Sequence, residues 1–106
     1  MDAATTAARG LEGKEVSTQQ KALEVFGADR QVDKCIEELA ELATALLKYR
    51  HGEATAAEVI DELADVEITT GTLRLLFDRK AIEARVLVKL DRLAGLVADQ
   101  VARDDR

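Results

Sequence analysis

The sequence is poor in several residue types that shape folds and sites. Its 106 residues include no proline or tryptophan, one cysteine, one histidine and three aromatic residues. The single cysteine, Cys35, excludes an intramolecular disulfide and is typical of a reducing compartment. The N-terminus has no signal-peptide-like apolar run, and no segment is long enough to span a membrane. We therefore expect a cytoplasmic protein.

The balance of charge is acidic, with a formal net charge of −6 at pH 7. Nucleic-acid polymers and anionic membranes are bound by basic surfaces, so we expect neither as a partner. A small nucleotide stays possible as a ligand, because a bound metal ion reverses the local sign of the field.

The composition favours helices over strands. Hydrophobic residues make up 47% of the chain and are mostly Ala and Leu, and strand-like alternation is absent outside a short stretch from Val66 to Thr70. A chain of this length forms one domain with a modest core. The sequence predicts an all-α fold: an antiparallel bundle of about four helices, completed by dimerisation.

Capping signals divide the chain. Ser17 and Gln20, and Thr55 and Glu58, have the spacing of capping boxes, whereas Gly27 and Gly52 are placed to end helices. We expect a flexible tail over 1–16, a single domain over 17–103 and a frayed end over 104–106. The basic pair Arg79-Lys80 marks a short connection. The expected helices cover residues 17–26, 29–51, 55–77 and 81–102.

Two groups of carboxylates stand out on the two middle helices. Residues three apart share a helix face, so Glu38 pairs with Glu41, and Glu62 pairs with Asp65. The twenty residues between Glu41 and Glu62 suffice to turn the chain back and lay the second helix antiparallel to the first. Four facing carboxylates are the oxygen ligands that Mg²⁺ or Mn²⁺ prefers.

The first acidic group is weak evidence alone, because it is also typical of a solvated amphipathic helix. Helical projection places it opposite an apolar sector that we expect to face the core. The second group is more informative, since Glu62 and Asp65 lie beside a helix surface that is apolar nearly all round and should be buried by several neighbours. Ionised carboxylates next to a packed surface need a metal ion or a salt-bridge partner, and we favour the metal ion here. The apolar sector of the helix expected over residues 29–51 comprises Val32, Cys35, Ile36, Leu39, Leu42, Ala43, Leu46 and Leu47.

The last expected helix carries a basic strip, formed by Arg85, Lys89 and Arg92, along one flank of its apolar face. These side chains either cover apolar surface with their stems or contact phosphate oxygens. Lys34, on the acidic face of the earlier helix, is a further phosphate candidate or an i,i+4 partner of Glu38.

Together these residues resemble the MazG-like, all-α nucleoside triphosphate pyrophosphohydrolases, in particular their short phage and bacterial forms. The family pattern Glu-Glu-x-x-Glu, a spacer and Glu-x-x-Asp reads here as Glu37-Glu38-Leu39-Ala40-Glu41 and Glu62-Leu63-Ala64-Asp65. Phe26-Gly27, Gln31-x-x-Lys34 and Lys89-Leu90-Asp91-Arg92-Leu93 are similar in their positions. The resemblance covers roughly residues 20–97.

The resemblance implies an enzyme that uses Mg²⁺, with Mn²⁺ as a possible substitute, to cleave an NTP or dNTP into the monophosphate and pyrophosphate. It implies Glu38, Glu41, Glu62 and Asp65 as metal ligands, and Glu37, together with Glu38, in catalysis. It further implies a homodimer or larger homo-oligomer with sites near subunit interfaces. The implied phosphate or substrate contacts are Lys34, Lys89, Arg92, Arg85 and Gln31.

Three other readings fit some of these residues. A non-catalytic helical interaction or regulatory module would use the same bundle, and a nucleotide-binding module would bind substrate without turnover. A carboxylate-bridged di-iron bundle requires Glu-x-x-His pairs. The only histidine, His51, lies ten residues from the nearest motif glutamate, which argues against the di-iron reading.

Overall fold

The computed structural model describes residues 3–106, with side chains from residue 12 onward, and is all-α throughout this range. It contains four helices and, over residues 3–106, no strand, which confirms the predicted fold class. The chain divides into two compact units, Met1–Leu76 and Phe77–Arg106. The helices are α1 (Ala3–Phe26), α2 (Ala28–Arg50), α3 (Ala56–Arg74) and α4 (Arg79–Asp104).

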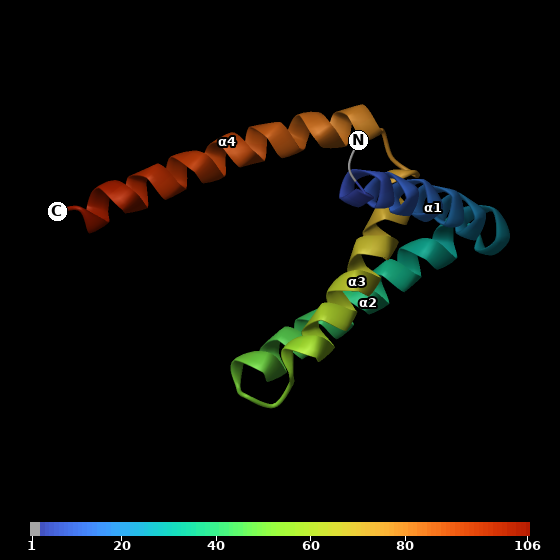
Figure 1. Cartoon of the computed structure of the whole chain (residues 1–106), viewed down its shortest axis with the longest axis horizontal. Coiled ribbons are helices and arrows are strands. Elements are labelled where there is room, and N and C mark those ends of the chain that lie inside the picture. Colours follow the sequence, from blue (N-terminus) through green and yellow to red (C-terminus); the bar gives the residue numbers. More distant parts are fainter. Residues whose placement is uncertain (1–2) are drawn as a thin grey trace. The chain divides into compact units, whose positions relative to one another are not determined.

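The first unit is organised around a hairpin of α2 and α3 (Figure 1). α2 ends at the predicted place, where His51 caps the helix and Gly52 adopts a positive φ of 72° that favours glycine. The predicted capping box then starts α3: Thr55 Oγ1 accepts from the Glu58 amide, and Glu58 Oε2 accepts from the Thr55 amide. These two signals set the turn that brings α3 back along α2.

α1 begins much earlier than predicted. Residues 3–16 are helical where we expected a flexible tail, and residues 1–2 lie outside the described range. The proposed capping box at Ser17 is wrong, because the Ser17 hydroxyl donates to the Lys14 carbonyl one turn earlier in a continuous helix. Alanine has the highest intrinsic helix propensity, and the Ala-rich start continues the helix without an apolar stripe.

A single residue, Gly27, connects α1 to α2. Its φ of 86° is reached without strain only by glycine, and its amide donates to the Leu23 carbonyl to close α1. The predicted helix end at Gly27 is therefore confirmed. Because the connection is one residue long, α1 turns directly into α2 and also contacts α3.

α1 contacts α3 through a buried glutamine. Gln19 is 5% exposed, and its Nε2 donates to the Ile68 carbonyl at 2.9 Å. Gly71 makes room for this side chain, because a Cβ there would collide with Gln19 Nε2. The polar contact attaches α1 to the middle of α3.

The buried side of α2 differs from the prediction. Cys35 is fully buried, as expected, but Glu38 is buried beside it at 6% exposure. Much of the predicted core sector instead faces solvent in the single chain, with Ile36 60% and Leu47 58% exposed. On α3, Ile60 and Leu63 are also exposed, although we expected neighbours around the whole helix. α2 thus directs part of its acidic face, and not its whole apolar sector, toward α3.

The second unit consists of α4 and the residues that lead into it. Asp78 caps the helix by accepting from the amides of Lys80 and Ala81, so Arg79 and Lys80 belong to the first turn and not to a connection as predicted. The preceding helix ends at Arg74, three residues before the predicted end at Phe77.

None of the helices in the described part of the chain combines the length and apolar character needed to cross a membrane.

We predict that Gly71→Ala weakens the attachment of α1. The added Cβ displaces Gln19 and breaks its buried hydrogen bond, which outweighs the gain in helix propensity and lowers the free energy of unfolding by about 1 kcal/mol. Gly13→Ala is the matched control, since nothing lies within 4 Å of its Cβ position. Urea denaturation followed by circular dichroism measures both, and equal effects of the two substitutions would contradict the contact.

Candidate metal centre

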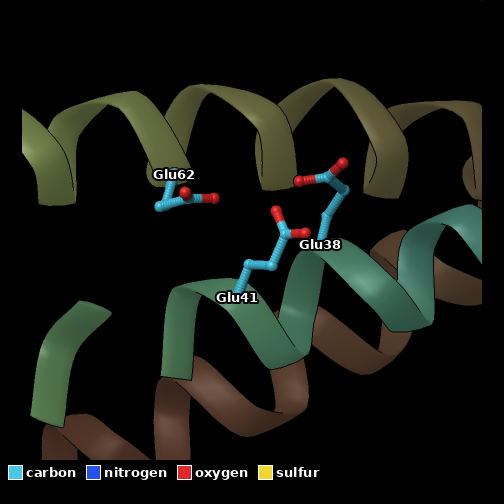
Figure 2. Close-up of side chains that lie close together, drawn as sticks. All are labelled: Glu38, Glu41 and Glu62. Carbon is cyan, nitrogen blue, oxygen red and sulfur yellow. The ribbon is translucent and has the colours of Figure 1, made fainter. Parts of the chain in front are cut away.

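Three carboxylates from α2 and α3 meet at the middle of the hairpin. Figure 2 shows Glu38 and Glu41 of α2 directed toward Glu62 of α3, with their oxygens in the space between the helices. One oxygen from each residue lies within 4.8 Å of the others. The antiparallel course of α3 after the turn produces this meeting, as the spacing of the two motifs predicts.

Burial distinguishes this cluster from ordinary surface acids. Glu38 is buried and Glu62 is half-buried, whereas Glu41 is exposed at the mouth of the cluster. Among the described residues, no hydrogen-bond partner reaches Glu38 Oε2 or Glu62 Oε2, and both atoms are inaccessible to solvent. Buried carboxylate oxygens are normally hydrogen-bonded or bound to a cation. The cluster thus has two oxygens whose bonding capacity the protein leaves unused.

Lys34 compensates only part of the charge. Its Nζ lies 3.0 Å from Glu38 Oε1 and 3.8 Å from Glu37 Oε1. The hydrogen bond to Glu38 raises the pKa of Lys34, and the charges of Glu37 and Glu38 add to this effect. Of the two roles predicted for Lys34, the structure shows the i,i+4 ion pair. Of the three clustered carboxylates, the ammonium pairs with Glu38 alone, so the cluster keeps an excess of negative charge.

The crowding of like charge changes the acidity of the cluster. The negative charge of Glu38, followed by desolvation, raises the pKa of Glu41 above its usual value of 4.5. Desolvation, followed by the charge of Asp65, raises the pKa of Glu62. Both shifts oppose full ionisation, and a cation bound among the three groups would relieve them.

The remaining predicted ligand, Asp65, lies outside the group of three. It is exposed, although its charge acts on Glu62 one turn earlier. Glu37 is also exposed and lines a cavity of about 540 Å³ together with Glu41 and Glu62. The predicted ligands are therefore brought together in part, with Asp65 and Glu37 at the periphery.

Sequence reasoning missed two acids in the same cavity, Glu53 and Glu58. Glu58 already serves the capping box, which explains its position without any ligand. Their positions at the turn could have predicted this, because a hairpin brings residues around its turn close to the end of α2.

The other predicted contacts lie outside the group of three carboxylates. Gln31 lies on α2, seven residues before Glu38, and lines two other hollows. Arg85, Lys89 and Arg92 are exposed on α4, in the second unit, and their contact with phosphate stays a prediction.

Comparisons with known proteins add no family assignment. No family model matches the chain, and no significant match was found among curated proteins or solved structures.

The raised pKa values predict how stability depends on pH. Between the unfolded carboxyl value near 4.5 and the raised pKa values of Glu41 and Glu62, the folded protein binds more protons than the unfolded chain. The contribution of these groups to stability is thus present at low pH and is lost as pH rises through the folded pKa values.

Denaturation of the metal-free protein at a series of pH values in a chelating buffer measures this dependence. Glu41→Gln should flatten the slope, because it removes one raised group and lowers the repulsion on the others. Glu24→Gln, an exposed position on α1, is the matched control. Identical slopes for the two variants would exclude the cluster as the cause.

Proposed function

We propose that the Glu38–Glu41–Glu62 cluster binds a hard divalent cation, Mg²⁺ or Mn²⁺. The observation that carries this proposal is the pair of buried carboxylate oxygens, on Glu38 and Glu62, that have no partner among the described residues. An all-oxygen ligand set without His or Cys suits Mg²⁺, Mn²⁺ or Ca²⁺ and disfavours softer metals. Asp65 would add a fourth carboxylate at the exposed side.

We further propose that the cation serves a nucleoside triphosphate, and that the protein is a Mg²⁺-dependent pyrophosphohydrolase. The support is the agreement between this cluster and the motif pair of the MazG-like enzymes, with Glu38, Glu41 and Glu62 adjacent in space. The open cavity beside the cluster, lined by Glu37, Lys48 and others, gives a phosphate chain access to the metal. Without a cation, such an acidic cavity would repel phosphates, so substrate binding should depend strictly on metal.

In this proposal water is the nucleophile, and the bond between the α- and β-phosphates breaks to release pyrophosphate and a monophosphate. A bound Mg²⁺ neutralises phosphate charge and lowers the pKa of a coordinated water. Glu37, exposed at the cavity wall, would orient the attacking water and accept its proton, or would hold a second metal. Lys34 stays paired with Glu38 and limits the net negative charge of the cluster. The family resemblance further implies that Arg85, Lys89 and Arg92 contact phosphate oxygens.

The exposed apolar residues support a homo-oligomer as the working form. Several large aliphatic side chains of α2 and α3 are about half exposed or more in the single chain, among them Ile36, Leu47 and Ile60. Large exposed apolar side chains can mark an interaction site, and a second copy of the chain would cover them isologously. The same observation favours the alternative of a non-catalytic interaction or regulatory module.

Thermal unfolding tests the metal site. Mg²⁺ with a non-hydrolysable triphosphate analogue should raise the Tm by roughly 10 °C at a hundredfold excess over Kd. Glu41→Gln or Asp65→Asn should remove most of that gain, and Glu41→Gln should raise the Tm of the metal-free protein because it relieves repulsion. The Glu24→Gln control should behave as wild type. If Glu41→Gln and Asp65→Asn both keep the full metal response, the proposed site is wrong.

Product analysis separates the enzyme from the binding module. Incubation with a panel of NTPs and dNTPs plus Mg²⁺ should yield monophosphate and pyrophosphate, and Glu38→Gln should reduce the rate by at least about a hundredfold, since it replaces a buried metal ligand. Diphosphate with inorganic phosphate would overturn the proposed bond cleavage. Binding without any product would favour the nucleotide-binding module.

A further inference from the structure

A second cavity lies between α1 and α3, and its wall contains none of the three carboxylates of the Glu38–Glu41–Glu62 cluster. Its volume is about 340 Å³, at the lower end of the range for small-molecule sites. Apolar parts of its wall come from Ala22 of α1 and from Ala64 and Ile68 of α3. Its size and partly apolar wall suit a planar heterocycle such as a nucleobase.

Shared residues connect this cavity to the acidic one. A hollow between α1 and α2 shares Ala22 and Gln31 with the α1–α3 cavity, and it shares Glu37 with the acidic cavity. Lys34 lies in the wall of this middle hollow. On α3, Ala64 directly precedes Asp65 and follows Glu62 by two residues. Phosphates at the cluster and a base in the α1–α3 cavity would thus occupy two hollows that are linked through the middle one.

The hydrogen-bonding groups in the cavity wall are mostly acceptors. Each threonine hydroxyl there already donates its one proton to a main-chain carbonyl: Thr18 to Lys14, Thr69 to Asp65 and Val66, and Thr72 to Ile68. A hydroxyl that has donated keeps only lone pairs for a ligand.

The side chain of the buried Gln19 likewise has no free donor for a ligand. Gln19 Nε2 donates to the Ile68 carbonyl at 2.9 Å and to Glu15 Oε1 at 3.4 Å, so both of its N–H groups are engaged. The orientation of the amide is fixed by these bonds, which leaves Oε1 as an acceptor. Glu15 and Glu67 add carboxylate oxygens to the wall, and donors are retained by Lys14 and Gln31.

We propose that the α1–α3 cavity binds the base of the nucleotide substrate and selects adenine and cytosine, which carry an amino group where thymine and uracil carry a carbonyl oxygen. This inference rests on the proposed nucleotide function. Adenine and cytosine present N–H donors to such a wall, whereas thymine and uracil present carbonyl oxygens at the corresponding position. An acceptor facing a carbonyl leaves both groups unpaired, which disfavours the complex.

Kinetics with matched substrates tests this selectivity. The wild-type protein with Mg²⁺ should cleave dATP or dCTP with a kcat/KM about tenfold or more above those for dTTP and for inorganic tripolyphosphate, which lacks a base. Thr18→Phe should fill the cavity and bring all four substrates to similar values. Gln20→Phe, on the neighbouring exposed position of α1 and outside the described cavities, should keep the wild-type ranking. Equal values for dCTP, dTTP and tripolyphosphate in the wild type would overturn the base site.

A binding measurement without turnover separates this inference from the proposed enzyme. Titration with dCMP and with dTMP in the presence of Mg²⁺, followed by NMR, should shift the side-chain amide signals of Gln19 and Gln31 with dCMP and much less with dTMP. Thr18→Phe should abolish the dCMP shifts while Gln20→Phe preserves them. Selective dCMP shifts in a protein that hydrolyses nothing would retain the base site and overturn the enzyme. Hydrolysis with no such shifts and no base preference would retain the proposed enzyme and overturn the base site.

Discussion

The structure depends on one constraint: three carboxylates are held together between two helices that also pack against each other. Glu38, Glu41 and Glu62 repel one another, and the burial of Glu38 and Glu62 strengthens that repulsion because little water screens it. A single ammonium, Lys34, offsets part of it. The α2–α3 hairpin brings these groups together even though their mutual repulsion destabilises the fold. Such a conflict is expected where residues are selected for function at a cost in stability.

The elements that sequence predicted well are those with local chemistry. Gly27 and Gly52 need a backbone conformation that favours glycine, and the Thr55–Glu58 capping box is complete within one turn, so each boundary follows from neighbouring residues. The start of α1 was missed because an Ala-rich segment without an apolar stripe resembles a tail. Asp78 was not predicted as a cap, because the basic pair Arg79-Lys80 that follows it is also typical of a connection between helices.

The candidate site was predicted from the spacing of the acidic residues along the two helices. The residues that were placed wrongly show which structural information this spacing does not contain. Helical periodicity places Glu38 with Glu41 and opposes them to Glu62, but it does not determine how far α2 rotates about its axis. That rotation turns Glu38 inward and leaves Ile36 and Leu47 exposed. The buried hydrogen bond of Gln19 could not be predicted for a related reason. It depends on the space left by Gly71, which is a contact between segments far apart in sequence.

The capping box and the short turn after α2 have a consequence for how the acidic cluster arises. All three carboxylates lie on one helix–turn–helix segment, between residues 38 and 62, so they are assembled by contacts that are local in the chain and close only a short loop. Neither α1 nor α4 supplies an oxygen to the group of three. Insertions and deletions in the outer helices can therefore alter the surroundings of the cluster over evolution while the ligand-bearing hairpin is inherited as a unit.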